Sequence, residues 1–282
     1  MDTPFGNEKR ITVWGLKGVG KSSMVEILPK DLDMLARTSG LKFDIHKIDG
    51  ENRTRARSPV QSQEPNSKFA YTQYEISIAD SKKSGKTYLL SLFDDKGDAM
   101  EGALKEPEKD EFKLITQNIM GAHGVVAIVD PLNAILNKKS KYLIELLDEM
   151  IYKLDQRQEK TSLAICLNKA DLIELRWKKP EVMFEMVFGP SWRSFQYMMK
   201  NVKNVNVKIF SVSTTGFGYN SRSESLPNYY MGKMIDVDVW QPWNVYAPFL
   251  WMFSQFESEG EPEGLIAKYF TPKGANYPKP LF

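Results

Sequence analysis

Residues 11–28, ITVWGLKGVGKSSMVEIL, place an apolar run, a glycine-rich turn and a helical run in direct succession. The turn at residues 15–22 fits the pattern G-x-x-x-x-G-K-[ST] at every fixed position. Glycines in such a turn let backbone N–H groups approach phosphate oxygens, and the following helix directs its positive end at the same phosphates. The sequence therefore predicts a phosphate-binding loop between a strand and a helix, which is a unit of α/β folds.

The side chains of this loop have separate expected tasks. The amine of Lys21 is placed to bridge the β and γ phosphates of a nucleotide, and the hydroxyl of Ser22 to bind Mg²⁺. The loop residues that we expect to contact the nucleotide are Gly15, Lys17, Gly18, Val19, Gly20, Lys21, Ser22 and Ser23.

A long loop and a β-hairpin are predicted next. Residues 50–68 are polar and include two prolines, so they cannot bury themselves and are expected to form a mobile loop. Residues 74–78 then alternate between apolar and polar side chains, and a Ser-Gly turn at 84–85 leads into the apolar run 88–93. This pattern is typical of two antiparallel strands.

From residue 94 onward, helical and strand patterns alternate. The runs 124–130, 162–168 and 206–212 are apolar throughout, which is typical of parallel strands covered by helices on both faces. We expect a three-layer α/β/α fold whose mainly parallel sheet contains one antiparallel hairpin strand. A ligand is expected at the carboxyl ends of the strands. A last helix is expected to start near Asn244, with Pro242 just upstream.

The composition narrows the classes of function. The 282 residues carry a net charge of +2, which gives no support for bulk nucleic-acid binding. The one cysteine, Cys166, excludes an intrachain disulfide and suits a reducing compartment. The N-terminal residues MDTPFGNEKR contain no apolar signal core, and the apolar stretch VYAPFLWMF near the C-terminus is too short to span a bilayer, so we expect a cytoplasmic protein.

A second motif, Asp94-Asp95-Lys96-Gly97, ends the apolar run 88–93. A carboxylate at the end of a strand beside a phosphate loop can hold Mg²⁺, usually through water, and Gly97 can offer an unobstructed N–H to a γ-phosphate.

A third motif, Asn168-Lys169-Ala170-Asp171, follows an apolar strand and points to the base. The carboxylate of Asp171 can accept two hydrogen bonds from one edge, which suits the N1–H and N2 amino donors of guanine. Asn168 can bond the opposite side of the base and tie neighbouring loops together, and the stem of Lys169 can lie along the base plane.

In this order, each at a strand end, the three motifs resemble those of the Ras-like, translation-factor-related class of P-loop GTPases. A fourth family element, a short loop after the last core strand, is matched loosely by Ser213, Thr214 and Thr215. The resemblance implies a G domain over residues 8–255, with residues 50–68 as an extended switch I loop, and an extended tail over residues 256–282.

The same resemblance implies GTP or GDP as the ligand, together with Mg²⁺. It implies a nucleotide-dependent switch that hydrolyses GTP slowly, changes order at residues 50–70 and 95–110, and works with a protein effector or activator. The implied metal ligands are Ser22, Asp94 and Thr54. The groups implied near the reacting phosphate are Lys17, Lys21, Gly97 and Asp98.

The chain departs from the family at three positions. Lys17 stands where Ras-like proteins often have Gly and Arf-like proteins have Asp, and its amine can either stabilise charge on the phosphates or point into solvent. Asp98 stands where a water-orienting Gln is usual, which puts the hydrolysis rate in doubt. The switch I threonine is assigned to Thr54 in preference to Thr72. Arg53, Arg55 and Arg57 near it can act as a cis arginine or belong to a disordered loop.

Two alternatives remain open. The length, the Asp-rich second motif and the C-terminal run WQPWNVYAP resemble double-GTPase proteins of bacterial and phage genomes. Asp98 is also compatible with a scaffold that binds guanine nucleotide in a larger complex and does not hydrolyse it.

Overall fold

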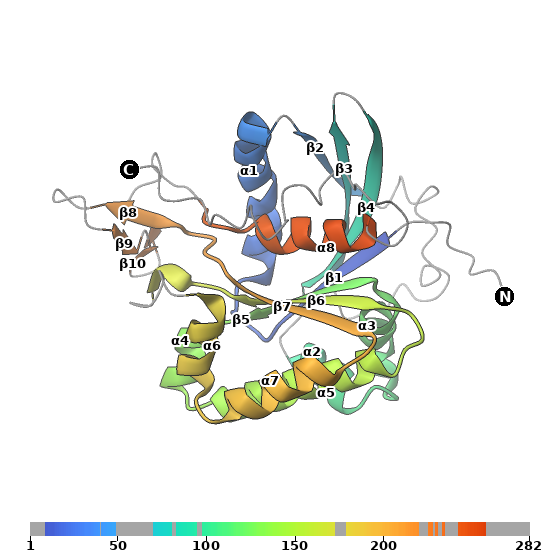
Figure 1. The fold of residues 1–282 in the computed structure, drawn as a ribbon, viewed down its shortest axis with the longest axis vertical. Helices are drawn as coiled ribbons and strands as arrows, with labels where there is room; N and C mark the ends of the chain where they lie inside the picture. The colour runs from blue at the N-terminus through green and yellow to red at the C-terminus, as the bar shows by residue number, and fades with distance from the viewer. Residues whose placement is uncertain are drawn as a thin grey trace.

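The computed structural model describes residues 9–39, 41–48, 70–80, 83–94, 98–172, 179–219, 225–227, 229–230, 233–234 and 242–257. Within them, a seven-stranded sheet lies between two layers of helices (Figure 1). The expected three-layer α/β/α fold is therefore confirmed.

The sheet has the strand order β2-β3-β4-β1-β5-β6-β7. The strands are β1 (Lys9–Trp14), β2 (Leu41–Ile48), β3 (Ala70–Asp80), β4 (Lys83–Asp94), β5 (Gly124–Val129), β6 (Thr161–Leu167) and β7 (Val205–Ser211). β4, β1, β5, β6 and β7 pair in parallel, whereas β3 is antiparallel to both of its neighbours, β2 and β4. The sheet is thus mainly parallel with one antiparallel strand, as the sequence predicts.

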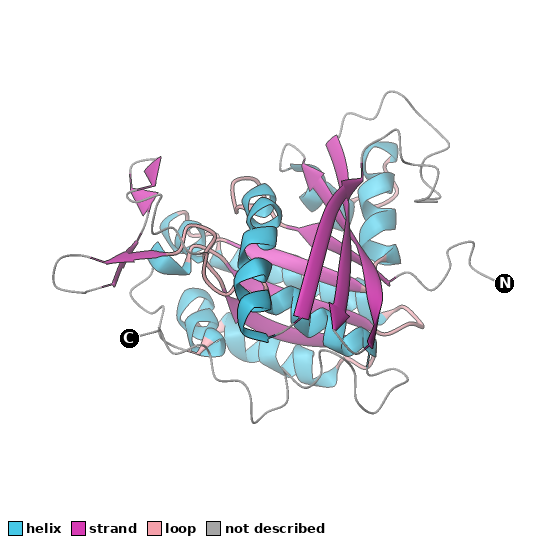
Figure 2. Cartoon of the chain, turned by 90° about the horizontal axis from the view of Figure 1, so that it is seen from above, coloured by secondary structure: helices cyan, strands magenta, loops and turns pink. Residues whose placement is uncertain are grey.

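Helices cover both faces of the sheet (Figures 1 and 2). One face packs against α1 (Lys21–Ser39) and α8 (Ala247–Glu257). The other face packs against α2 (Asp98–Lys105), α3 (Asp110–Gly121), α4 (Pro131–Leu136), α5 (Ser140–Asp155), α6 (Pro180–Phe188) and α7 (Ser191–Asn201). A 3₁₀ turn, η3 (Ala170–Leu172), follows β6. Two small hairpins, β8 (Phe217–Tyr219) with β9 (Ser225–Pro227) and β10 (Tyr229–Tyr230) with β11 (Lys233–Met234), lie between β7 and α8.

The central strands are buried on both faces. In β5, Val125 and Val129 pack under the α2–α7 layer, while Val126 and Ile128 pack under α1 and α8. Every residue of β5 and of β6 is buried, including Cys166. Each such aliphatic side chain contributes about 1.5–3 kcal/mol through burial, so the middle of the sheet is a rigid base for the loops at its edges.

The elements differ from the sequence expectation in four places. The hairpin turn expected at residues 84–85 lies earlier, because β3 ends at Asp80 and β4 begins at Lys83. β2 has no predicted counterpart, although its LKFDIHKI sequence alternates apolar and polar residues. Within the expected second switch loop, residues 98–105 form helix α2.

The fourth difference is the start of the last helix, which is Ala247 instead of a residue near Asn244. Asn244 has a left-handed backbone, with φ 58°, and its side-chain Nδ2 donates to the carbonyl oxygen of Ser211 at 2.9 Å. The amide of Tyr246 donates to Oδ2 of Asp31 in α1 at 2.7 Å. The segment before α8 therefore forms hydrogen bonds with β7 and α1 instead of extending the helix.

Candidate nucleotide-binding site

The parallel strands bring the predicted motifs to one edge of the sheet. The glycine loop follows β1, Asp94 ends β4, Asn168 follows β6, and Ser213 comes shortly after β7. Carboxyl ends of parallel strands share one edge, which is where open α/β sheets bind ligands. The glycine loop lies centrally, with Asp94 on the β4 side and the loops of β6 and β7 on the other side.

Two glycines of the loop are required by close contacts. A Cβ on Gly15 would meet the carbonyl oxygen of Ile128 at 2.7 Å. Gly20 has φ 95°, and a Cβ there would meet Nδ2 of Asn168 at 2.5 Å. A side chain at either position would thus push the loop away from β5 or from the loop after β6.

The amine of Lys21 points back into the glycine loop. Its Nζ donates to the carbonyl oxygens of Gly15 at 2.7 Å and Leu16 at 3.2 Å, and the side chain is buried. Among the other loop residues expected to contact a nucleotide, Val19 is buried, Gly20 and Ser22 are half-buried, and Lys17, Gly18 and Ser23 are exposed.

Asn168 joins the loop after β6 to the glycine loop. Its Nδ2 donates to the carbonyl oxygen of Val19 at 2.8 Å, across 149 residues of sequence, and the residue is fully buried. Its Oδ1 is buried as well and has no hydrogen-bond partner among the described residues. The side-chain amide of Asn168 therefore forms one direct link between the two loops.

Lys169 makes a second link between the same loops. Its Nζ donates to the carbonyl oxygen of Gly18 at 3.2 Å and to Oδ2 of Asp130 at 2.5 Å. Lys169 has a left-handed backbone, with φ 59°. Successive residues of the Asn168–Lys169 pair thus bind successive carbonyls of the glycine loop.

Asp171 is held by hydroxyl groups from the loop after β7. Ser213 Oγ donates to its Oδ1 at 2.5 Å, and Thr215 Oγ1 donates to its Oδ2 at 3.2 Å. Burial raises the pKa of the Asp171 carboxyl above its ordinary value, and the hydrogen bonds from Ser213 and Thr215 oppose this rise. Thr214 is buried beside them.

A short two-way bridge holds Ser213 in place. The amide of Ser213 donates to the carbonyl oxygen of Trp243 at 2.9 Å, and the amide of Trp243 donates to that of Ser213 at 2.8 Å. The segment before α8 therefore supports the hydroxyl groups that contact Asp171.

The expected metal ligands are described only in part. Ser22 lies in the first turn of α1 and Asp94 is the last residue of β4, whereas Thr54 and Gly97 lie outside the described residues, as do Arg53, Arg55 and Arg57. Asp98 is the first residue of α2. Across the described part of the chain, three or more His, Cys, Asp or Glu side chains nowhere gather as a metal site would require.

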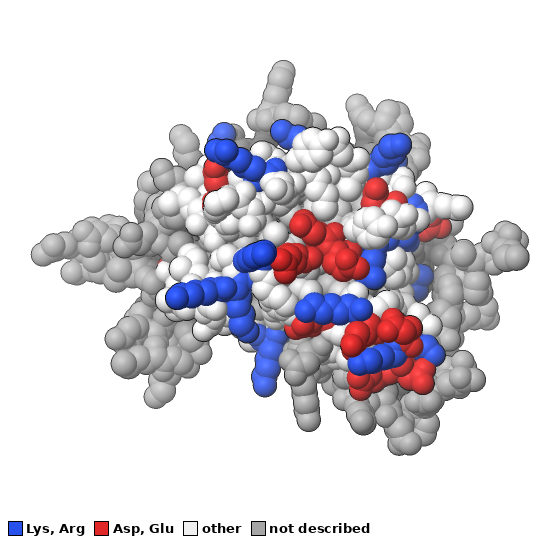
Figure 3. All heavy atoms as spheres, turned by 90° about the horizontal axis from the view of Figure 1, so that it is seen from below, with Lys and Arg blue, Asp and Glu red and all other residues white. Residues whose placement is uncertain are grey.

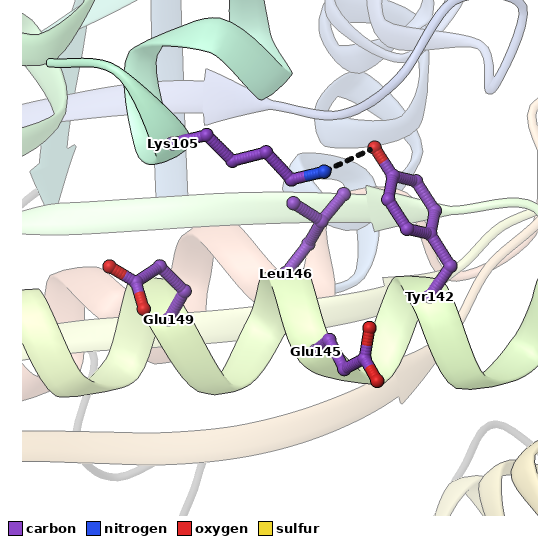
Figure 4. A pocket seen from close by; sticks show the side chains of 5 residues that line it. All are labelled: Lys105, Tyr142, Glu145, Leu146 and Glu149. Carbon is purple, nitrogen blue, oxygen red and sulfur yellow. Dashed lines mark hydrogen bonds between the residues drawn. The ribbon is translucent and has the colours of Figure 1, made fainter.

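A hollow of about 330 Å³ lies between α2 and α5, and none of the predicted site residues that the structure describes lines it (Figure 4). Its lining residues are Lys105, Tyr142, Glu145, Leu146 and Glu149. The amine of Lys105 lies 4.6 Å from the centre of the Tyr142 ring and pairs with Glu101 at 2.8 Å.

Figure 3 shows that side chains of both charge signs gather on the underside of the molecule. Along α5, Glu145 and Glu149 pair with lysines of their own helix.

No protein-family model matches the sequence, and no curated protein matches it either. Among solved structures, the chain is similar to the Arl6 BBS3 small GTPase from Trypanosoma brucei with bound GppNp, at 10% identity and a TM-score of 0.44, over 90% of this chain and 99% of that one. It is also similar to the mammalian SRP receptor, at 15% identity and a TM-score of 0.40, over 73% of this chain and 92% of that one.

A third similar structure is the small COPII coat GTPase SAR1 from Encephalitozoon cuniculi in complex with GDP. The identity is 15% and the TM-score 0.35, over 75% of this chain and 72% of that one. At these identities and TM-scores, the comparisons assign neither a ligand nor an activity to this chain. Separately, none of the described helices has the length and apolar character needed to cross a bilayer.

Sequence reasoning missed two contributors to this edge of the sheet. Asp130 binds the amine of Lys169, and its only sequence signal is a carboxylate at the end of an apolar strand directly before Pro131. Trp243 supports Ser213 through backbone groups alone, and a backbone contact of this kind leaves no signal in residue types.

Proposed function

We propose that this protein binds GTP and GDP and acts as a nucleotide-dependent switch that hydrolyses GTP slowly. The observation that carries the proposal is the double link between the glycine loop and the Asn168–Lys169 pair, with the Asp171 carboxylate two residues after Lys169. A phosphate-binding element and a base-binding element in direct contact form a site for one nucleotide.

The strand order gives the proposed nucleotide an orientation. The glycine loop and Asp94 follow the neighbouring strands β1 and β4, and they form the phosphate and metal side. Asp171 and Ser213 follow β6 and β7, and they form the base side. The nucleotide would therefore lie across the carboxyl edge, with its sugar near the end of β5.

The acceptor oxygens of Asp171 at the base side favour guanine. Asp171 already accepts one hydroxyl hydrogen bond on each oxygen, and a carboxylate has about four lone-pair sites. The carboxylate also accepts its own backbone N–H, so the two adjacent donors of guanine would share its two oxygens with these contacts or replace them. Adenine has no such pair of donors, so it would add no paired hydrogen bonds to this carboxylate.

At the phosphate side, Lys21 would exchange partners when nucleotide binds. Its amine now satisfies two loop carbonyls, and charged phosphate oxygens are stronger acceptors for an ammonium group. The hydroxyl of Ser22 at the start of α1 fits a Mg²⁺ ligand, with Asp94 and Thr54 as further proposed ligands. The bound ion would neutralise charge that develops on the phosphates.

Slow hydrolysis is proposed because the chain has an acid, Asp98, where an amide commonly orients water. The proposed positive charge near the reacting phosphate comes from Lys21 and Lys17, and Gly97 would offer its N–H. Lys17 is exposed, so it is free to approach a bound phosphate without breaking a buried contact. A protein activator would then supply the missing stabilisation.

A competition experiment with fluorescent GDP tests the nucleotide assignment. Unlabelled GTP and GDP should displace the probe at concentrations at least a hundredfold below those that ATP requires, because only guanine pairs with Asp171. Equal displacement by ATP would contradict the proposal. Single-turnover assays with radiolabelled GTP then measure hydrolysis, and binding without any product would favour the non-hydrolysing scaffold.

A further inference from the structure

We propose that Asp130 is a positioning residue for the nucleotide site, because it holds the amine of Lys169 against the glycine loop. This inference rests on the proposed function and extends it to a residue outside the three motifs. Asp130 directly follows β5, the strand between the phosphate side and the base side.

The two oxygens of Asp130 have different partners. Oδ1 accepts the backbone N–H of Asn133 at 2.9 Å, which caps the N-terminus of α4. Oδ2 accepts the amine of Lys169 at 2.5 Å. The Asp130 side chain is buried, with about 5% of its surface exposed, so the carboxylate is held in one orientation from both sides.

The Lys169 side chain is long and flexible, so its amine needs a partner such as the Asp130 carboxylate to hold it in place. A lysine amine sits on a flexible stem, and fixing that stem costs conformational entropy. The Lys169 side chain is one-third exposed and would otherwise sample many positions. The carboxylate instead holds the amine where it also reaches the carbonyl oxygen of Gly18.

The consequence is a site that is ordered before the nucleotide arrives. The loop after β5, the loop after β6 and the glycine loop are joined through one amine, and the stem of Lys169 lies between the two proposed halves of the site. Ordering in advance removes an entropy cost from binding, and so slows ligand dissociation. Asp130 would act on the nucleotide only through Lys169.

A double-mutant cycle tests this dependence. Asp130→Asn keeps an oxygen that can cap α4, since Asn caps helices as well as Asp does, and removes the charge that holds Lys169. We expect dissociation of fluorescent GDP to become about tenfold faster in Asp130→Asn and also in Lys169→Met. The double variant should match Lys169→Met within about twofold, because without the amine the carboxylate has nothing to position.

Asp155→Asn is the matched control. Asp155 is also a carboxylate that accepts backbone N–H groups, from Lys203 and Asn204, but it lies beside the start of β7, at the opposite end of the strand from the site. Fluorescent GDP should dissociate from Asp155→Asn at the wild-type rate. Multiplicative effects of about a hundredfold in the double variant would overturn the proposal, as would an unchanged rate in Asp130→Asn.

A second readout needs no nucleotide. We expect an amine-reactive ester to label Lys169 several-fold faster in nucleotide-free Asp130→Asn than in the wild type, while labelling of the exposed Lys160 stays constant. Unchanged labelling of Lys169 and an unchanged rate would overturn the role of Asp130 and leave the proposed function intact. Faster labelling in a protein that binds no guanine nucleotide would overturn the proposed function and leave the positioning of Lys169 intact.

Discussion

The base side and the phosphate side of the candidate site are built by different means. At the base side, side chains bond to side chains: Asp171 binds Ser213 and Thr215, and Lys169 binds Asp130. At the phosphate side, the amine of Lys21 bonds to carbonyl groups of its own loop. The proposed base side is thus formed in advance, whereas the amine of Lys21 at the proposed phosphate side would have to exchange partners when a nucleotide binds. We therefore expect specificity to come mainly from the first and affinity mainly from the second.

The largest expected effect is on specificity, in Asp171→Asn. One charge-assisted hydrogen bond to guanine, worth about 1.5–3 kcal/mol, is lost because an amide donor replaces one acceptor, and the other bond loses its charge, so GDP affinity should fall by about a hundredfold or more. Xanthine nucleotides should gain affinity, because an amide donor then faces a carbonyl group. Isothermal titration calorimetry with GDP and XDP measures both changes. A uniform loss for both nucleotides would mean that Asp171 only supports the fold.

Lys21→Ala should weaken GTP and GDP by one to two decades without changing the preference for guanine. The lost contacts are charge-assisted bonds to phosphate, and the base side is left intact. Competition of GTP against ATP in this variant tests whether the two sides act separately, because the ratio of the two affinities should then equal that of the wild type. A collapse of that ratio would show that the two sides are not separable.

Guanine affinity should fall as the pH is lowered through the raised pKa of Asp171. Burial raises the pKa of Asp171, so its carboxyl takes up a proton at a higher pH than an ordinary aspartate does. Guanine donors favour the charged form, so affinity is full above the raised pKa and falls about tenfold per pH unit below it. Binding titrations between pH 4 and pH 8 check this. Lys21→Ala should keep the same slope, and a flat profile would argue against a base contact at Asp171.

The smallest expected effects concern turnover. Lys17→Ala should slow single-turnover hydrolysis several-fold if its exposed amine reaches the phosphates, with little change in GDP affinity. Asp98→Gln should also leave affinity nearly unchanged, and either raise the hydrolysis rate or leave it alone. Fast wild-type hydrolysis without a partner, abolished in Asp98→Ala, would show instead that Asp98 is itself catalytic.

The sequence predicted the middle of the sheet well because burial on both faces leaves a continuous apolar run. β5 and β6 end within one residue of their expected positions. The loop motifs were also readable, since Gly20 and Asn168 are constrained by a contact that few other residue types could make. The roles of the named site residues toward a nucleotide stay predictions.

What the sequence could not show depends on distant contacts. Asn244 is a residue type that commonly precedes a helix. Its left-handed backbone and its hydrogen bond to the carbonyl oxygen of Ser211 keep it out of the helix, so α8 begins at Ala247. Asp130 reads as a helix cap before Pro131, and its partner Lys169 is 39 residues away. Neither pairing leaves a pattern in the local sequence, because each is decided by which strands are neighbours.

The segment before α8 also sets the order in which the molecule can be assembled. Tyr246 bonds to Asp31 across 215 residues, and Trp243 closes the loop that holds Asp171. On a ribosome, α1 and its face of the sheet must therefore wait for nearly the whole chain before α8 covers them. Contacts this far apart in sequence make folding slow. A nascent chain stopped before residue 243 would expose the apolar face under α8, which makes it a natural substrate for chaperones.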